Sequence, residues 1–205
     1  MSFAKTPYGE SEFLKSLREE AAKEESYAPI VAPDTAQLLV TMIEAQKPRR
    51  ILEIGTAIGY SAILMASHAP CAKIITIERY QKAADRAIDN IFAVNMAERI
   101  SVVAGEAAEV LMWLDGTFDF VFLDAAKGQY IEFLPRITQL LRPGGMLFSD
   151  NVLFRGMTED DSLVVRRKIT IVERLRSYIE KITACEEYTT CLVPVGDGAA
   201  ISVRR

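Results

Sequence analysis

The chain has 205 residues, of which 50% are hydrophobic and 25% charged, with a formal net charge of -4 and a pI of about 5.2. This composition is typical of a globular protein with a sizeable core, and the acidic balance argues against a protein that coats nucleic acid while permitting a local basic patch. Three widely spaced cysteines without a C-x-x-C pair, no apolar run of membrane-spanning length and no signal peptide favour a cytoplasmic protein with no membrane partner.

Helical and strand patterns alternate along the chain. An amphipathic helix over Glu10–Lys23 precedes a stiff connector, Ala28–Asp34, and we expect Asp34 to cap the next helix, Thr35–Gln46. The later helices are expected at Tyr60–Ser67, Gln81–Val94, Glu106–Leu114, Gly128–Leu141 and Ser162–Lys181. The strands are expected at Ile51–Ile54, Lys73–Glu78, Ile100–Ala104, Phe118–Asp124, Met146–Ser149, Tyr188–Val193 and Ala199–Val203, with a turn at Arg142–Gly145.

The alternation predicts an α/β fold with a mostly parallel sheet and helices on both faces. The short glycine-rich connection between the last two strands indicates an antiparallel pair. Without a linker or repeat, we expect one domain over residues 1–205, in which residues 1–48 form an N-terminal helical cap.

A glycine turn follows the first strand. The segment Arg50–Ser61 has the sequence RILEIGTAIGYS, in which a strand carrying Glu53 leads through Gly55 and Gly59 into a helix. Such glycines let the backbone approach a ligand at the end of a parallel strand. The spacing is not the G-x-G-x-x-G of dinucleotide binders, and the nearby carboxylate repels a pyrophosphate. The pattern favours S-adenosylmethionine (SAM), which carries a sulfonium and no phosphate, although a plain strand-to-helix connector is the alternative.

Further acids stand at the next strand ends. Glu78 ends the second strand, where its two acceptor oxygens match a ribose diol, and a solvated strand end is the alternative. Glu106 and Ala107 follow the third strand and are placed to frame an adenine. An acid at a helix N-terminus is also favoured by the helix dipole alone.

Oxygen ligands follow two other strands. Asp124 ends one strand, and Asp150 and Asn151 follow another. These side chains suit Mg²⁺, Mn²⁺ or Ca²⁺ rather than Zn²⁺, and an Asp-Asn turn without a metal is the alternative. Lys127 points toward the metal in the first interpretation, where its neutral amine can accept a proton. In the second it is an ordinary lysine at a helix start.

Basic residues concentrate near the C-terminal third of the chain. They are Arg155, Arg166, Arg167, Lys168, Arg174 and Arg176, most of them on the expected long helix. A run of charges usually forms a solvated face, and the alternative is a patch that contacts RNA phosphates.

Four features occur together: LEIGTAIGYS at 52–61, Glu78, FLDAAKGQY at 122–130 and SDN at 149–151. Over nearly the whole chain they resemble the class I SAM-dependent methyltransferases, and more narrowly the cation-dependent catechol and caffeoyl-CoA O-methyltransferases. DNVLFRG at 150–156, the basic run at 166–168 and PVGDGAAIS at 194–202 resemble the bacterial tRNA 5-hydroxyuridine methyltransferases most closely. Many plant members carry a further aspartate where this chain has Ala126, which argues against a caffeoyl-CoA acceptor.

The resemblance implies a Rossmann-like class I methyltransferase fold with a seven-stranded sheet and one antiparallel strand, and family members are commonly homodimers. It implies catalysis by Lys127 with Asp124, and metal ligands at Asp124, Asp150 and Asn151. The implied SAM contacts are Val31, Glu53, Gly55, Ser61, Glu78, Glu106, Ala107 and Asp124. We assign the contacts to the acceptor to Arg155, Arg166, Arg167 and Lys168.

The expected reaction is Mg²⁺-dependent methyl transfer to 5-hydroxyuridine at the tRNA wobble position, giving 5-methoxyuridine. A small catechol or phenol is the alternative acceptor, because the same catalytic residues serve it. A nucleotide-binding oxidoreductase and a catalytically silent SAM-binding domain are further alternatives. The glycine spacing and the Asp-Asn pair count against the oxidoreductase, and the intact ligand set with Lys127 counts against the silent domain.

Overall fold

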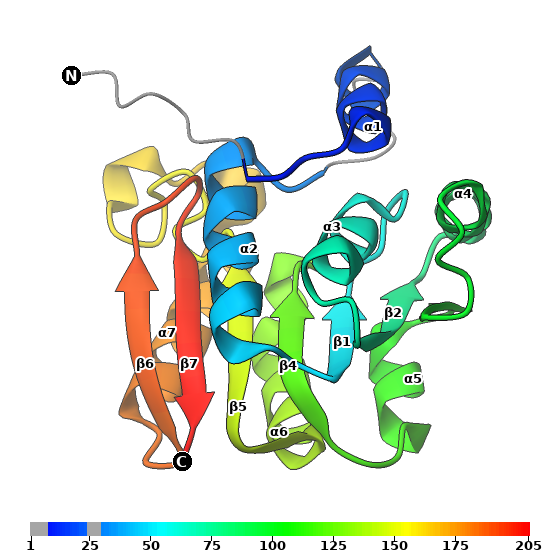
Figure 1. Cartoon of the computed structure of the whole chain (residues 1–205). Helices are drawn as coiled ribbons and strands as arrows, with labels where there is room; N and C mark the ends of the chain where they lie inside the picture. Colours follow the sequence, from blue (N-terminus) through cyan, green and yellow to red (C-terminus); the bar gives the residue numbers. More distant parts are fainter. Residues whose placement is uncertain (1–7, 24–29) are drawn as a thin grey trace.

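A computed structural model describes residues 8–23 and 30–205 of the chain. In this part of the chain, one seven-stranded sheet lies between two groups of helices (Figure 1). The strands are β1 (Arg50–Ile54), β2 (Lys73–Glu78), β3 (Ile100–Ala104), β4 (Phe118–Leu123), β5 (Leu141–Asp150), β6 (Tyr188–Val193) and β7 (Ala199–Arg204). The helices are α1 (Glu12–Lys23), α2 (Pro33–Gln46), α3 (Tyr60–His68), α4 (Gln81–Ala93), α5 (Ala107–Trp113), α6 (Tyr130–Leu140) and α7 (Ile169–Ala184), with short 3-10 turns η1 (Lys127–Gln129), η2 (Asp161–Leu163) and η3 (Arg166–Lys168).

The strands lie in the order β3-β2-β1-β4-β5-β7-β6. The first five in this order are parallel, and β7 runs antiparallel to both of its neighbours. The predicted α/β fold, with its seven-stranded and mostly parallel sheet, is confirmed. The chain direction across the sheet reverses between β1 and β4, and a crevice at such a reversal is where open α/β sheets bind ligands.

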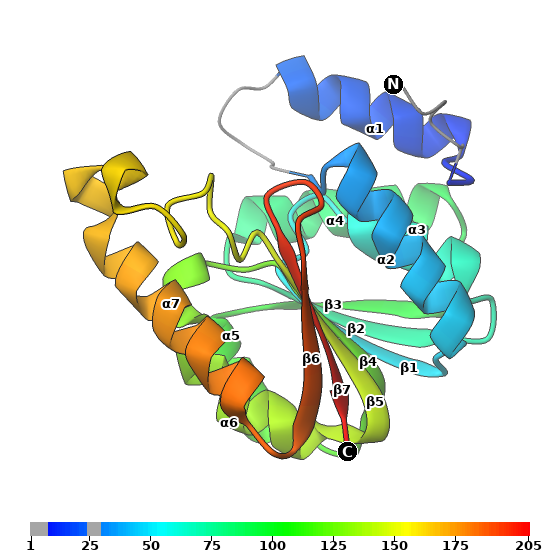
Figure 2. The same cartoon turned by 90° about the vertical axis from the view of Figure 1, so that its left-hand side faces the viewer.

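Both faces of the sheet are buried under helices. In Figure 2, α2, α3 and α4 lie on one side of the sheet and α5, α6 and α7 on the other. Two adjacent residues of β1 show this. Ile51 belongs to the hydrophobic cluster that includes residues of α2 and α3, and Leu52 belongs to the cluster that includes residues of α6 and α7. A strand buried on both faces has a continuous apolar sequence, and for this reason β1 and β4 were predictable.

At the start of the chain, one local prediction is wrong and another lies partly outside the described residues. The prediction that Asp34 caps the second helix is wrong: α2 begins at Pro33, and Ala32 holds the N-cap position without a side-chain hydrogen bond. Proline is favoured at a first helical position, because its missing N–H would be unsatisfied there. The first two residues of the expected connector Ala28–Asp34 lie outside the described residues.

Two further predictions are wrong in the second half. The expected helix Ser162–Lys181 begins only with α7 at Ile169, after η2 and η3, because Asp160 caps a short turn through Ser162 and the next residues are extended. The expected turn Arg142–Gly145 lies within β5. There the register advances by two residues along β4, from Phe118 to Phe120, while β5 advances by five, from Leu141 to Met146, as in an enlarged bulge.

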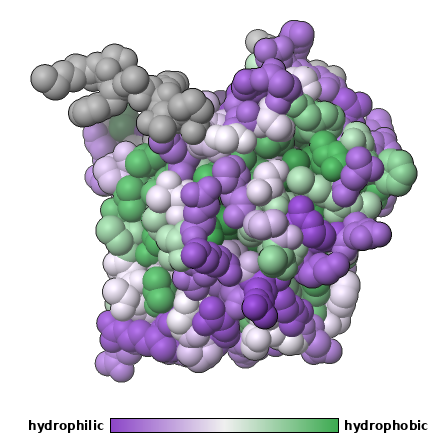
Figure 3. All heavy atoms as spheres, viewed as in Figure 1, coloured by the Kyte–Doolittle hydropathy of each residue, from purple (hydrophilic) through white to green (hydrophobic). Residues whose placement is uncertain are grey.

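Hydrophilic and hydrophobic side chains are mixed over the face shown in Figure 3. Among the helices of the described residues, none is long and apolar enough to cross a membrane.

Candidate active site

Gly55 brings the ends of β1 and β4 together. Its φ is 106°, and a Cβ at this position would lie 2.1 Å from the carbonyl oxygen of Asp124. The Asp124 backbone N–H in turn donates to the Ile54 carbonyl at 2.9 Å. Only glycine permits this approach, so the first glycine of the turn places β1 directly beside the candidate catalytic acid.

Glu53 is completely buried on β1. Its two carboxylate oxygens accept hydrogen bonds from the hydroxyls of Ser61, in α3, and Thr76, in β2. Burial raises the pKa of Glu53 from 4.5 to about 8, and the charges of Asp124 and Glu78 add to this effect, while the two hydroxyl hydrogen bonds oppose it. A cation bound at this edge of the sheet would favour the ionised form.

Glu78 is not a solvated strand end, since only 7% of it is exposed. One carboxylate oxygen accepts from the backbone N–H of Ala57, in the glycine turn, and the other from that of Tyr80, both at 2.9 Å. The carboxylate therefore anchors the turn, and each oxygen keeps a lone pair for another donor.

The remaining candidate cofactor residues differ in burial. Val31 is buried immediately before α2. Glu106 is exposed at the N-cap of α5 and its side chain makes no capping hydrogen bond, while Ala107 is half-buried. The structure thus joins Glu53 and Ser61 by a direct hydrogen bond, and it leaves both interpretations of Glu106 open.

The second group of candidates lies at the ends of β4 and β5. These strands are parallel and Leu123 pairs with Ser149. Asp124 and Asp150, the next residue of each strand, therefore lie side by side at the same edge of the sheet. Asp150 is 1% exposed, and burial and the charge of Asp124 raise its pKa to about 7. Lys127 donates to Asp124 Oδ1 at 2.5 Å.

Asn151 follows in a left-handed conformation, with φ of 56°. Its backbone N–H donates to Asp150 Oδ1 at 2.7 Å. Within the described ranges, no three His, Cys, Asp or Glu side chains gather as a metal cluster, and the predicted set of ligands consists of two carboxylates and one amide.

Sequence reasoning missed two residues that organise these groups. Tyr130 is fully buried, and its hydroxyl lies 3.0 Å from the carbonyl oxygens of both Leu123 and Asp150, so that one proton is shared between the ends of β4 and β5. Thr76 supports Glu53 as described above. The signal for Thr76 was a lone polar residue inside the apolar strand β2, whereas an aromatic residue at a helix start gave no comparable signal for Tyr130.

The basic candidates divide into two groups. Arg174 donates to Glu132 at 2.9 Å, and Arg176 donates to Asp161 at 2.6 Å and to the carbonyl of Thr158, so these two arginines hold the local structure together.

The other basic residues face solvent more freely. Arg166 and Arg167 are exposed on η3, and within the described residues neither forms an ion pair. Lys168 lies over the ring of Phe154, 5.6 Å from its centroid. Arg155 is also exposed, and its backbone N–H donates to the Asp197 carboxylate. Arg166–Lys168 therefore form an exposed basic turn, which contacts the segment that follows Asn151.

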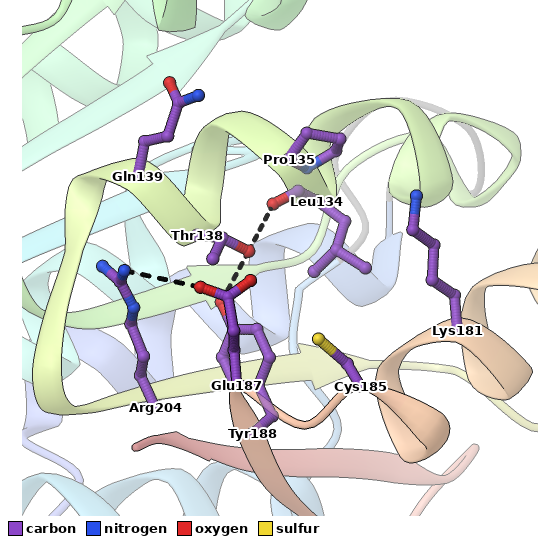
Figure 4. Close-up of a pocket in the computed structure, with 9 residues that line it drawn as sticks. All are labelled: Leu134, Pro135, Thr138, Gln139, Lys181, Cys185, Glu187, Tyr188 and Arg204. Atoms are coloured by element: carbon purple, nitrogen blue, oxygen red, sulfur yellow. Dashed lines mark hydrogen bonds and ion pairs between the residues drawn. The ribbon is translucent and has the colours of Figure 1, made fainter.

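The hollow drawn in Figure 4 lies elsewhere. It measures about 430 Å³ and lies between the C-terminal ends of α6 and α7, where β6 starts and β7 ends. Lys181 and Arg204 reach it from opposite sides, and Arg204 pairs with Glu187 at 3.6 Å (Figure 4). This is the opposite end of the sheet from Asp124 and Asp150, so the hollow is not part of the candidate active site.

Nearly the whole chain is similar to known O-methyltransferases. A family model described as O-methyltransferase matches residues 4–205. The caffeoyl-CoA O-methyltransferase of Petroselinum crispum is 29% identical over 206 residues, covering 95% of this chain and 85% of that relative. A Staphylococcus aureus structure, provisionally assigned as a caffeoyl-CoA O-methyltransferase, is 34% identical with a TM-score of 0.88, covering 95% of this chain and 93% of that one. A Bacillus cereus O-methyltransferase in complex with SAH, the demethylated product of SAM, is 28% identical with a TM-score of 0.84, covering 95% of this chain and 91% of that one. Since the family match spans nearly the whole sequence, the chain belongs to the O-methyltransferase family and is a SAM-dependent O-methyltransferase.

Proposed function

We propose that this enzyme uses SAM and a divalent cation to methylate the 5-hydroxyl of 5-hydroxyuridine at the wobble position of tRNA. The observation that carries the choice of acceptor is the exposed basic turn Arg166–Lys168. Lys168 packs over Phe154, three residues beyond the candidate metal ligand Asn151. A cationic surface therefore lies along the chain segment that leads out of the active site, where a nucleic-acid backbone can reach it.

In this proposal SAM binds at the crevice between β1 and β4. Gly55 lets the ends of β1 and β4 meet there, and Glu78, with Glu53 once a bound cation favours its ionised form, supplies negative charge beside a cationic nucleoside. The free lone pairs of Glu78 accept the two ribose hydroxyls. The other proposed contacts are Val31, Ser61, Glu106, Ala107 and Asp124.

The ends of β4 and β5 fit a divalent cation. Two carboxylates lie close enough for the charge of Asp124 to raise the pKa of Asp150, and the neighbouring amide of Asn151 adds a third hard oxygen. Asp124, Asp150 and Asn151 would hold the ion, which would supply Lewis-acid stabilisation to the acceptor oxygen. Tyr130 keeps the backbone of both strand ends in place.

Lys127 is the proposed base. In the structure it donates to Asp124 at 2.5 Å, and an ammonium has no lone pair with which to accept a proton. We therefore propose that Lys127 is neutral when the acceptor is bound and takes the proton of its hydroxyl. Lys127→Arg tests this role, because a guanidinium keeps the charge and cannot accept a proton. We expect kcat to fall at least roughly 100-fold while the affinity for SAH stays within about threefold.

A small catechol or phenol is the second candidate acceptor. It is favoured by the relatives, several of which are named caffeoyl-CoA O-methyltransferases. One observation favours RNA instead: Arg166 and Arg167 are exposed on the basic turn, and within the described residues neither is neutralised by an ion pair. The groove of about 400 Å³ beside this turn is lined by Asp161 and Glu173 as well as by Arg166 and Arg176, so it favours neither acceptor.

Mass spectrometry of tRNA nucleosides tests the proposal. The purified enzyme is incubated with SAM, Mg²⁺ and tRNA that contains 5-hydroxyuridine, and catechol is assayed in the same buffer. We expect conversion to 5-methoxyuridine that stops on chelation of the metal. Methylation of catechol with no conversion of the tRNA would establish the small-molecule alternative.

A pair of variants tests the basic turn. Arg166→Gln combined with Arg167→Gln removes two exposed charges, and we expect the methylation of tRNA to weaken roughly tenfold with a shallower salt dependence, while the methylation of catechol is unchanged. Lys181→Gln removes a charge at the opposite end of the sheet and serves as the control. Equal effects of both changes on tRNA methylation would contradict a specific role for the turn.

A further inference from the structure

A polar network joins α1 to the proposed SAM site. Its centre is Arg18, whose side chain is 22% exposed. The guanidinium donates to Glu10 at 2.9 Å and to the carbonyl of Val31 at 3.1 Å. It also donates to the hydroxyl of Tyr8 at 2.5 Å and to that of Tyr60. Arginine can make these four bonds because it presents five N–H donors in a planar fork.

The network closes on itself through Tyr60. The Tyr60 hydroxyl donates to Glu10 and lies 3.0 Å from the hydroxyl of Tyr8, and the guanidinium carbon of Arg18 lies 4.7 Å from the centroid of the Tyr60 ring. Burial opposes a charge on Glu10, but hydrogen bonds from Tyr60 and Arg18 outweigh it and lower the pKa of this carboxyl. Arg18 therefore keeps an ionised partner.

Two of the groups held by Arg18 belong to the proposed SAM site. Val31, which is 3% exposed, is itself a proposed contact. Tyr60 begins α3 and immediately precedes Ser61, whose hydroxyl donates to Glu53. One guanidinium thus connects two segments of the site that lie about 30 residues apart in the sequence.

Other contacts are available to dock α1. Leu14 and Leu17 are buried in the hydrophobic cluster that includes α3, and both views place α1 against α3 (Figure 1; Figure 2). A second ion pair, between Glu20 of α1 and Arg86 of α4 at 2.5 Å, also ties the helix down, and it is nearly half exposed. Attachment of α1 therefore does not require Arg18, whereas the link between Val31 and Tyr60 does.

We propose that Arg18 is a positioning residue for the cofactor: it fixes the Val31 segment against the first turn of α3 and so sets the affinity of the site for SAM. This inference rests on the proposed function, in which Val31 and Ser61 contact SAM. Arg18 touches neither the reacting methyl group nor the acceptor oxygen in this assignment, so its loss acts on cofactor binding and leaves the chemical step intact.

Titration calorimetry with SAH and steady-state kinetics test the inference. For Arg18→Gln we expect the Kd for SAH and the KM for SAM to rise roughly tenfold, with kcat at saturating SAM within about twofold of the wild type. Arg18→Lys should weaken binding as well, because an ammonium cannot span four acceptors. Arg86→Gln breaks the other contact of α1 and should bind SAH as the wild type does.

These measurements separate a failure of the proposed function from a failure of the role proposed for Arg18. Failure of the wild type to bind SAH would overturn the proposed function itself. Wild-type affinity in Arg18→Gln would overturn only the role of Arg18, as would equal weakening by Arg86→Gln, because attachment of α1 would then be the cause. If circular dichroism shows that Arg18→Gln is unfolded, Tyr60→Phe replaces it, since this variant keeps the ring and loses the three hydrogen bonds of the hydroxyl to Arg18, Glu10 and Tyr8. Severalfold weaker SAH binding by Tyr60→Phe supports the inference, and unchanged binding overturns it.

Discussion

Replacement of Glu53 by glutamine should make the protein more stable at high pH. Burial raises the pKa of Glu53 in the folded protein to about 8, whereas its ordinary value is 4.5. The folded state therefore keeps a proton between these values that the unfolded chain releases. The contribution of this carboxyl to stability is fully present below about pH 4.5 and is lost as the pH rises to about 8.

The magnitude follows from the two pKa values. A difference of about 3.5 units corresponds to roughly 5 kcal/mol, since each unit is worth about 1.4 kcal/mol. Glutamine keeps the size of the side chain, but its NH₂ group has one donor more than the O–H of the protonated carboxyl, and only the hydroxyls of Ser61 and Thr76 are there to receive it. That change costs about 1 kcal/mol. Glu53→Gln should therefore be about 1 kcal/mol less stable than the wild type near pH 4.5 and several kcal/mol more stable above pH 8.

Urea unfolding monitored by circular dichroism measures this difference in the free energy of unfolding. The titrations are carried out without SAM at several values between about pH 5 and about pH 8.5. Glu109→Gln removes the same charge from an exposed position on α5 and should show no comparable trend. A difference between Glu53→Gln and the wild type that stays constant across the pH range would refute the reasoning.

Three further predictions follow from the same edge of the sheet. Gly55→Ala places a Cβ against the Asp124 carbonyl at a positive φ, so we expect roughly 2–4 kcal/mol of destabilisation, measured by thermal unfolding. Tyr130→Phe removes the hydroxyl between Leu123 and Asp150. It should cost roughly 1–3 kcal/mol and lower kcat more than the affinity for SAH. Removal of divalent ions by EDTA should abolish turnover while calorimetry still detects SAH binding, and full activity after exhaustive chelation would contradict a metal mechanism.

The fold was predictable where burial is uniform along a segment. The central strands β1 and β4 have nearly continuous apolar sequences, and helices such as α4 and α6 bury one face. Prediction failed where short-range capping competes with helical periodicity. The charged residues at 160–168 fit a helical pattern, but Asp160 accepts from the N–H of Ser162, and Val164 and Val165 are extended before the next turn. The helix therefore begins only after these residues and the short turn that follows them, at Ile169.

The site was predictable where topology alone determines proximity. Parallel strands end at one edge of the sheet, so Asp124 and Asp150 had to meet once β4 and β5 were neighbours. Contacts that depend on three-dimensional packing had no signal of their own. Three examples are the backbone N–H groups that bind Glu78, the hydroxyl of Tyr130 between two strand ends, and the contact of Arg18 with Tyr60. Each brings together residues whose spacing in the sequence follows no helical or strand period.

The distribution of charge explains how an acidic protein can serve an RNA acceptor. Glu78 and Asp124 give the strand ends negative charge, and a bound cation would favour the ionised forms of Glu53 and Asp150 as well, so this edge attracts a sulfonium and a divalent ion and repels phosphates. A tRNA backbone therefore cannot lie across the crevice. Under the proposed function, the tRNA backbone binds the exposed basic turn Arg166–Lys168 beside the crevice, and only the uncharged base enters the acidic edge of the sheet. The wobble nucleotide of an anticodon loop suits this arrangement, because an unpaired base can leave the stack at little cost.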